Sequence, residues 1–559
     1  MPGREVDKKV AAKLAEAISK QYGKGAAYSK FYVGVDVCIA CHTDYGDFKQ
    51  SMHYTAFKQT RNDMHTMKTK SGVIADYDQN GVDDFKQGLD FNRIASAFDR
   101  YKPNAPILGY STQKGYFMKI GDVEVLSQFS YGGSGYYKQR WVGKIPVVDR
   151  PDRLSASYYT LPVQYNEVTK QYVTYNPQFW YDAQNRPIFT ATSTSRDAAN
   201  LGNNFDKKCA GCHFTGIAMS KTEQGEYMAV APQAFVVDPA DPHLFDYNGD
   251  GEVDQFTTGC ERCHGPGSTH VITVGDPSRI INPSRDLTSQ QINNLCSSCH
   301  VRGVSKGAGT FEFPMNETTL TGAADIIGED VTKDIWTPRP GRWTDNQESR
   351  QHHQQGNDYL FSAHSSSRFG PVGCNTCHNV HNTVKGHVRD KMTVKNASGA
   401  DVTIATKVTD NTQCLACHAG HGPFAELKTE DIANVTANLA TIGRVVSKHT
   451  FHAYRPDGPS ALSRCTECHM ANMASSAIPN DISSHTFDVV PPDKTLQGMA
   501  NGGTGMPNSC AARCHKPLAG LFGLPVQPDQ SIWNLPADRS QSEWLKTFYG
   551  PNGTWWKRP

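Results

Sequence analysis

The sequence contains no long apolar run. None of its 559 residues belongs to an unbroken stretch of eighteen apolar side chains, so no transmembrane helix is predicted. The opening residues, Met1-Pro-Gly-Arg, also lack the apolar region of a signal peptide. No charge of one sign dominates, because 56 Lys and Arg face 55 Asp and Glu. This balance gives no indication of a basic nucleic-acid-binding surface or of an acidic solvating tail.

Cysteine, by contrast, is plentiful and regular. All 16 cysteines fall into one repeated pattern, and none is left over. Seven times Cys-x-x-Cys is followed directly by histidine, at Cys38/Cys41/His42, Cys209/Cys212/His213, Cys260/Cys263/His264, Cys296/Cys299/His300, Cys374/Cys377/His378, Cys414/Cys417/His418 and Cys465/Cys468/His469. The eighth copy, Cys510/Cys514/His515, has one extra residue between its cysteines. This spacing indicates cofactor attachment rather than a disulfide framework.

Haem is the cofactor that needs these residues in this order. Its two vinyl groups form thioether bonds with two cysteines, and the histidine after the second cysteine is then placed to bind the iron. A single copy could also be half of a zinc site or a redox-active pair. Eight copies that together use all 16 cysteines leave almost no room for either alternative. We therefore predict eight covalently attached haem c groups.

The second ligand of each iron separates an electron carrier from a catalyst, because an iron with two histidine ligands has no open position for substrate. Eight of the 21 histidines belong to the motifs, which leaves 13, enough for bis-histidine ligation throughout. We predict these second ligands to be His53, His270, His353, His364, His381, His421, His452 and His485.

The local context of these histidines differs. His381 and His421 each follow a motif histidine by three residues, a spacing that commonly sends the second histidine to a neighbouring haem. His352 is an alternative to its neighbour His353. Four others, His65, His243, His387 and His449, are interpreted as surface or hydrogen-bonding histidines.

The stretches between the motifs predict the domain organisation. Residues 6–20 have apolar side chains at helical spacing. Residues 105–195 are rich in Tyr, Val, Thr and Gly, and segments such as 123–126 and 171–175 are typical of strands. We predict an N-terminal helix with the first haem at 1–104, a haemless β-rich module at 105–195, a seven-haem domain at 196–515 and a haemless aromatic tail at 516–559.

Little regular structure is expected within the seven-haem region, because haem replaces much of the core there. Two short helices are predicted, one from Thr288 into Cys296 and one over 429–446. The tail contains Trp533, Trp544, Trp555 and Trp556 among polar residues. These tryptophans either pack on the protein's own surface or form a docking segment, since Trp is enriched in interfaces.

A second metal signal occurs in two loops that share the pattern Asp-x-Asp/Asn-x-Asp/Asn-Gly-x-x-Asp. The first contains Asp76, Asp78, Asn80 and Asp84, and the second contains Asp246, Asn248, Asp250 and Asp254. Alternating oxygen ligands around a glycine bend suit Ca²⁺, and the loops resemble EF-hand or thrombospondin-type calcium loops. Gln87 and Thr257 stand where an EF-hand has its bidentate Glu. The alternative is a solvated turn, for which this composition is also typical.

With eight motifs between positions 38 and 515, the chain resembles the octahaem c-type cytochromes of anaerobic respiration. The segment from His452 to Pro491, which contains Cys465-Thr-Glu-Cys-His-Met and then Ser484-His-Thr-Phe, and the segment from Gln351 to His381 are similar to periplasmic and outer-surface multihaem cytochromes. The resemblance implies a multihaem cytochrome c fold with short helices around a haem chain and a small β-rich insertion. It also implies electron transfer, in the form of a subunit of an extracellular conductive cytochrome filament.

The alternative is an octahaem reductase or oxidase acting on nitrite, hydroxylamine, tetrathionate or sulfite. Such enzymes keep one iron open or bound by lysine, and no motif here has lysine in place of histidine. We therefore expect an electron-transfer protein rather than an enzyme. The expected location is the cell exterior or cell surface, or alternatively the periplasm, with the signal peptide not part of this sequence. Redox proteins or extracellular acceptors are the expected partners, together with self-association and without nucleic acid.

Overall fold

The computed structural model describes residues 8–22, 30–60, 75–235, 241, 243–305, 327–330, 336–338, 341–368, 370–500, 505–525 and 533–549. Within these ranges no helix has the length and apolar character needed to span a membrane. The chain forms two compact units, residues 1–339 with 381–383, and residues 340–380 with 384–559. The boundary between them lies inside the stretch 196–515, which the sequence interpretation treats as one domain.

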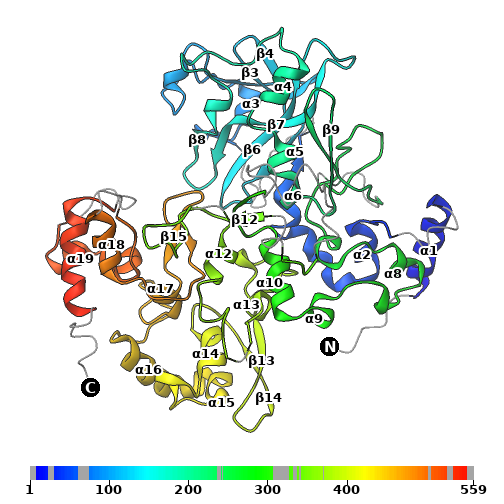
Figure 1. Ribbon diagram of the computed structural model, residues 1–559. Helices are drawn as coiled ribbons and strands as arrows, with labels where there is room; N and C mark the ends of the chain where they lie inside the picture. Colours follow the sequence, from blue (N-terminus) through cyan, green and yellow to red (C-terminus); the bar gives the residue numbers. More distant parts are fainter. Residues whose placement is uncertain are drawn as a thin grey trace. The chain divides into compact units, whose positions relative to one another are not determined.

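The first unit contains two antiparallel sheets between the first and second motifs, drawn mainly in cyan in Figure 1. A three-stranded sheet has the order β2-β3-β4, and a five-stranded sheet has the order β1-β5-β6-β7-β8. The strands are β1 (Phe57–Gln59), β2 (Ile107–Ser111), β3 (Gly115–Ile120), β4 (Val123–Leu126), β5 (Phe129–Gly132), β6 (Lys138–Pro146), β7 (Leu154–Asn166) and β8 (Gln171–Thr174). The strands predicted at 123–126 and 171–175 are confirmed.

Both faces of the five-stranded sheet are covered along β7, because its residues from Ser155 to Asn166 are all buried and successive side chains point to opposite faces. Tyr159 and Trp141 belong to one aromatic core, which is formed within the β-rich region. Tyr158 and Phe129 belong to a second core that also includes Phe214, directly after the second motif. The second motif therefore packs against one face of this sheet.

Short helices make up most of the remainder of the first unit. They are α1 (Lys8–Tyr22), α2 (Val35–Cys41), α3 (Asp84–Gln87), α4 (Ser195–Asn200), α5 (Phe205–Lys208), α6 (Ala210–His213), α7 (Glu261–His264), α8 (Ser268–Ile272), α9 (Pro283–Asp286) and α10 (Ser289–Ser297). Two-stranded pairs join β9 (Ala218–Lys221) to β10 (Tyr227–Val230) and β11 (Gly303–Ser305) to β12 (Trp336–Pro338).

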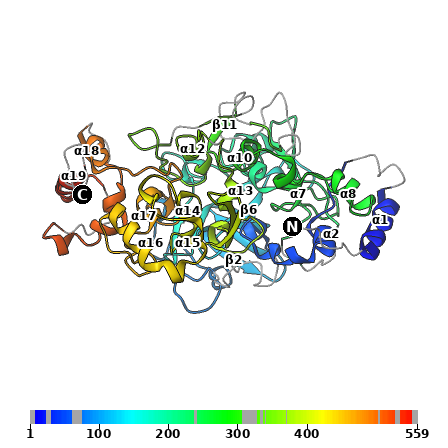
Figure 2. The same cartoon turned by 90° about the horizontal axis from the view of Figure 1, so that it is seen from below.

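Two of these helices were expected from the sequence. The predicted N-terminal helix is α1, which lies beside α8 (Figures 1 and 2). The predicted capping box at α10 is also present, because Thr288 and Gln291 cap each other.

The second unit is built from short helices and two hairpins. Its elements are α12 (Gln355–Tyr359), α13 (Cys374–Cys377), α14 (Thr412–His418), α15 (Thr429–Ala433), α16 (Val435–Thr450), α17 (Cys465–His469), α18 (Pro492–Ala500), α19 (Pro536–Phe548), β13 (Lys391–Lys395), β14 (Asp401–Ala405), β15 (Asn472–Ala474) and β16 (Ile482–Ser483). The predicted helix over 429–446 is divided at Asn434, whose φ of −118° and ψ of 50° are not helical.

Helices α18 and α19 lie side by side in both views (Figures 1 and 2). Trp533 is buried just before α19 and shares a small core with Ala511 and Leu545. For Trp533, packing on the protein itself is therefore the correct interpretation. Trp555 and Trp556 lie outside the described residues.

Candidate haem-binding sites

Six attachment motifs lie on short helices, namely α2, α6, α7, α13, α14 and α17. The fourth motif begins at Cys296 in the last turn of α10, and Cys299 and His300 follow in the turn after that helix, where the His300 N–H donates to the Cys296 carbonyl at 3.0 Å. Residues three apart lie on the same side of a helical turn. Both cysteines of a Cys-x-x-Cys pair are thus presented on one side, and the adjacent histidine ends the turn.

The eighth motif also lies on a helical turn, although it has one extra residue between its cysteines. Residues Ala511–His515 form a π-helical turn, in which the Lys516 N–H donates to the Ala511 carbonyl at 3.0 Å. A π turn holds one more residue than an α turn. The wider turn therefore accommodates the insertion and keeps Cys510 and Cys514 on the same side.

Seven of the eight motif histidines face a second imidazole. The ring centres are 6.2 Å apart for His42 and His270, 6.2 Å for His264 and His381, 6.4 Å for His300 and His53, 6.2 Å for His378 and His485, 6.0 Å for His418 and His364, 6.3 Å for His469 and His449, and 6.4 Å for His515 and His452.

This separation tests whether the residues fit a bound iron. A metal stands about 2 Å from an imidazole nitrogen, so two imidazoles on opposite sides of one metal place their ring centres about 6 Å apart. The seven observed separations, 6.0 to 6.4 Å, agree with this value. The seven pairs therefore fit haem iron held between two histidines.

Two predicted ligands have other contacts in the structure. The imidazole of His353 lies against that of His352, and His421 is exposed, so both remain predictions as ligands. His449, interpreted as a surface histidine, is the residue that faces His469. It lies in the last turn of α16, away from any motif, so no local signal marks it. His65 lies outside the described residues.

Backbone carbonyls orient several of these imidazoles. The Nδ1 atom lies 2.8 Å from the Ile281 carbonyl in His264, 2.7 Å from the Gly386 carbonyl in His378, 3.0 Å from the Phe487 carbonyl in His469, 2.8 Å from the Asp276 carbonyl in His270 and 2.6 Å from the Thr450 carbonyl in His452. An Nδ1–H donated to a carbonyl leaves Nε2 unprotonated, which is the form that binds metal. These contacts therefore fix both the tautomer and the ring direction.

Burial favours the same neutral form. It lowers the pKa of His42, His264, His418 and His449. The effect is larger for His213 and His515, whose pKa falls to about 4 because burial disfavours the charged imidazolium. At neutral pH these imidazoles are uncharged and able to bind metal.

Several cysteines lie close to a cysteine of another motif. Cys260 raises the pKa of Cys38, Cys299 raises that of Cys212, and Cys414 raises that of Cys465. Electrostatic interactions link Cys263 to Cys299, Cys377 to Cys414, and Cys468 to Cys514. Motifs five, six, seven and eight thus form an unbroken series in the second unit. In the first unit, the same interactions connect the first motif to the third, the third to the fourth, and the fourth to the second.

A buried carboxylate ties the first motif to the third. Glu261 accepts hydrogen bonds from the N–H groups of Val33 (2.9 Å), Gly34 (2.8 Å) and Gly267 (2.7 Å), and from the Gln255 side chain (2.9 Å). Val33 and Gly34 directly precede α2, which carries the first motif. Glu261 itself begins α7, which carries the third.

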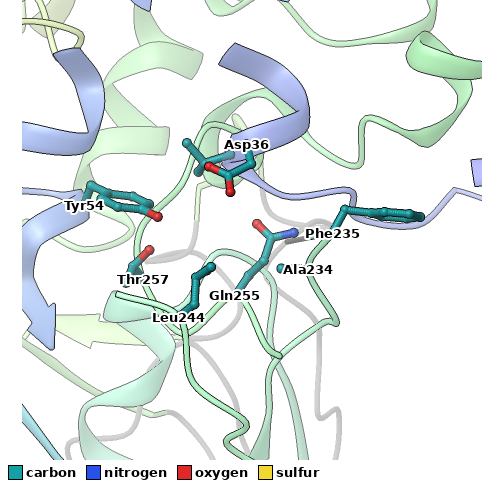
Figure 3. Close-up of a pocket in the computed structure, with 8 residues that line it drawn as sticks. Asp36, Tyr54, Ala234, Phe235, Leu244, Gln255 and Thr257 are labelled. Carbon is teal, nitrogen blue, oxygen red and sulfur yellow. The ribbon is translucent and has the colours of Figure 1, made fainter. Parts of the chain in front are cut away.

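A small pocket of about 260 Å³ lies beside α2. Asp36, Tyr54, Gln255 and Thr257 line it, and Figure 3 shows their polar atoms around its centre. The Tyr54 hydroxyl donates to Asp241 at 2.9 Å. No motif cysteine or histidine lines this pocket, so it is a structural feature rather than a haem site.

The two predicted calcium loops have closely similar geometry. In the first, Asp76 accepts hydrogen bonds from the N–H groups of Asn80 (3.0 Å) and Gly81 (2.8 Å). In the second, Asp246 accepts from the N–H groups of Asp250 (3.1 Å) and Gly251 (2.9 Å).

The first loop also gathers possible ligand atoms. One carboxylate oxygen from each of Asp76, Asp78 and Asp84 lies within 4.8 Å of the others. Burial raises the pKa of Asp84 to about 7, as it does for Asp254 of the second loop. Carboxylates this close repel one another, and a cation would relieve that repulsion.

Comparisons with known proteins give two similar structures. The chain is similar to the outer cell wall cytochrome OcwA, with 18% identity and a TM-score of 0.44 over 86% of this chain and 83% of that one. It is also similar to an undecahaem cytochrome from the S-layer of Carboxydothermus ferrireducens, with 14% identity and a TM-score of 0.25 over 80% and 66% of the two chains. No family model and no curated protein matches it.

The eight attachment motifs and the seven paired imidazoles together suit a protein that holds several covalently attached haems.

Proposed function

We propose that the protein transfers electrons through a chain of eight covalently bound haems. The observation that carries this proposal is the set of seven histidine pairs with ring centres 6.0 to 6.4 Å apart. Iron with two histidine ligands has no free position for substrate, which favours electron transfer over catalysis. When bound, haem supplies an iron centre that gains and loses single electrons. The chain's own residues hold these centres, fix their ligands and exclude water.

The contacts between cysteines support a specific order of transfer. In the second unit, Cys377 interacts with Cys414, Cys414 with Cys465, and Cys468 with Cys514. We infer a linear relay from the fifth haem through the sixth and seventh to the eighth. Removal of an internal haem should interrupt this relay, whereas removal of the terminal haem should not.

The relay can be tested by voltammetry on the full-length protein attached to an electrode through its N-terminus. One variant, Cys414→Ser with Cys417→Ser, lacks the sixth haem, and its matched control, Cys510→Ser with Cys514→Ser, lacks the eighth. At fast scan rates without mediators, the first should lose the charge of three haems and the control the charge of one. Intact mass verifies the haem content. Equal losses in the two variants would refute the linear order.

For the location and partners of the protein, we propose the cell exterior or cell surface, with the periplasm as the alternative. Covalent attachment to cysteine fits a compartment outside the reducing cytoplasm. Donor and acceptor redox proteins or extracellular acceptors are the proposed partners. Assembly into a filament is proposed as well, and electron microscopy of the purified protein across a concentration series tests it.

Calcium is proposed as a structural ion in the two acidic loops. Carboxylate and amide oxygens at alternate positions around a bend are the ligands that Ca²⁺ takes. Because an ion that binds only the folded state stabilises it, added calcium should raise the Tm relative to chelator. Asp78→Asn and Asp250→Asn should each reduce this rise, and the control Asp47→Asn, an exposed carboxylate outside both loops, should leave it unchanged. A Tm that does not respond to calcium would refute the proposal.

A further inference from the structure

Arg262 lies inside the third attachment motif, between Cys260 and Cys263, and the residue is almost completely buried, with 4% of its surface exposed. Its guanidinium Nη2 donates to the Gly211 carbonyl at 3.3 Å and lies 3.4 Å from the Cys299 sulfur. Gly211 belongs to the second motif and Cys299 to the fourth. One buried positive charge therefore lies where three attachment motifs meet.

The attachment points of the second and fourth haems adjoin at this arginine. The Cys299 sulfur lies 3.6 Å from the Cys212 carbonyl. In the loaded protein, each of these thiols is the thioether sulfur that joins a haem to the chain. The guanidinium of Arg262 therefore lies beside the attached edge of the fourth haem and against the backbone that carries the second.

A second arginine brings positive charge to the second motif from the five-stranded sheet. Arg140 of β6 pairs with Tyr131 of β5, and its guanidinium lies 5.5 Å from the centre of the Tyr131 ring. That ring contacts His213, with ring centres 5.9 Å apart. Burial has the largest effect on the pKa of Cys209, which it raises, and on that of His213, which it lowers, and the charge of Arg140 acts to lower both. The second motif therefore lies close to two arginine charges.

Asp206 brings an opposing charge to the neighbourhood of Cys209. Its carboxylate accepts hydrogen bonds from the N–H groups of Tyr158 (2.6 Å) and Ala229 (2.8 Å) and from the Tyr247 hydroxyl (2.8 Å). Burial outweighs these hydrogen bonds and raises the pKa of Asp206 to about 7, so the carboxyl group is partly protonated at neutral pH. Its negative charge therefore offsets the two arginines only in part.

A positive charge near a haem favours the reduced state, because reduction removes one positive charge from the iron. We propose that Arg262 and Arg140 raise the reduction potential of the second haem above those of the other haems in the first unit, so that electrons collect there. The second motif is an end of the series of cysteine interactions in this unit. The proposal rests on the proposed function, since it requires haems that exchange electrons. It concerns equilibrium potentials rather than the order of transfer, so the relay can fail while the potentials hold, and the reverse.

Potentiometric titration of the full-length protein with its haems, followed by electron paramagnetic resonance, tests this proposal, because the signal of each ferric haem disappears on reduction. Arg262→Gln and Arg140→Gln should each lower the equilibrium constant for reduction of the same haem about tenfold, which is about 59 mV for one electron. Arg262→Lys and Arg140→Lys, which keep the charge, should stay within about threefold of wild type. The matched control Arg93→Gln, at an arginine whose side chain is 85% exposed, should titrate as wild type does. Intact mass verifies eight haems in each variant.

Two further variants identify the affected haem. Cys209→Ser with Cys212→Ser lacks the second haem, so the shifted signal should be missing from it, and intact mass verifies the loss of one haem. Arg140→Gln with Arg262→Gln should lower the equilibrium constant about a hundredfold, because the two charges act independently. Unchanged potentials in both glutamine variants, or lysine variants shifted as far as the glutamine variants, would overturn the proposal. A shifted signal that persists without the second haem would overturn its assignment to the second motif.

Discussion

The imidazoles of His449 and His469 are nearly parallel, with an interplanar angle of 11° and ring centres 6.3 Å apart. His469 is fixed by the Phe487 carbonyl, and Phe424 packs against His449 with ring centres 5.2 Å apart. A residue at the end of a long helix thus completes a site whose other ligand is twenty residues away on a different helix.

Substitution of His449 should open the seventh iron. We expect His449→Ala to convert one low-spin haem to high-spin, because no second histidine then faces His469. His421→Ala is the matched control, since His421 is exposed and should leave the electron paramagnetic resonance spectrum unchanged. Spin quantitation of both oxidised proteins distinguishes the two outcomes. If His421→Ala gives the new high-spin haem instead, the pairing of His449 with His469 is wrong.

A buried ion pair joins the eighth motif to the last helix. Lys516 and Asp538 lie 2.9 Å apart, and their side chains are 2% and 1% exposed. Asp538→Ala leaves a buried charge without its partner and should lower the free energy of unfolding by about 3–5 kcal/mol. The more exposed pair of Lys546 on α19 and Asp493 on α18, whose side chains are 51% and 28% exposed, provides a control, and Asp493→Ala should cost no more than about 1 kcal/mol. Chemical denaturation measures both, and similar losses would contradict the expectation.

The Asp241 carboxylate should make stability depend on acidic pH. Burial alone would raise its pKa, but hydrogen bonds from Lys49 (2.7 Å) and from the His243 N–H (2.9 Å) outweigh burial and hold it below the ordinary value. Stability from a depressed pKa is fully present above the unfolded value, about 3.9, and is lost as the pH falls through the folded value.

Asp241→Asn should therefore be less stable than wild type at pH 7, and the difference should shrink as the pH falls below about 4. Denaturation at a series of pH values measures this change. The control Asp47→Asn removes an exposed carboxylate and should show no such convergence. A constant difference between Asp241→Asn and wild type would exclude Asp241 as the source.

Glu261 should hold the first and third motifs together. Glu261→Ala removes the acceptor of the buried N–H groups of Val33, Gly34 and Gly267. Unsatisfied buried donors cost about 1–3 kcal/mol each, so this variant should be several kcal/mol less stable. Glu252→Ala, at an exposed position nearby, should change stability by less than about 0.5 kcal/mol. A stable Glu261→Ala protein would show that other contacts join these motifs.

The sequence predicted those features that depend on local spacing. The attachment motifs are local, and the strands at 123–126 and 171–175 follow from their composition. His270, His364 and His485 were chosen from short surrounding segments, and each faces a motif histidine.

The remaining features depend on contacts between distant segments. His449 has no motif around it, so only the packing of α16 reveals its position opposite His469. His421 has the same spacing as His381, yet it is exposed, because spacing does not determine which segments meet. Phe57 and Tyr131 come from two paired strands, and both rings contact His213 of the second motif.

The position of His381 in the chain affects how the protein can be made. His381 faces His264 of the third motif, although it follows the fifth motif in the sequence. His270 and His53 likewise face histidines of motifs that are far from them along the chain, namely His42 and His300. Under the proposed function, the third haem can be attached before the segment that contains its second ligand has been synthesised. Covalent attachment of this haem and binding of His381 to its iron are therefore separate events in time. A chain that ends before residue 381 would hold the third haem without its second histidine ligand.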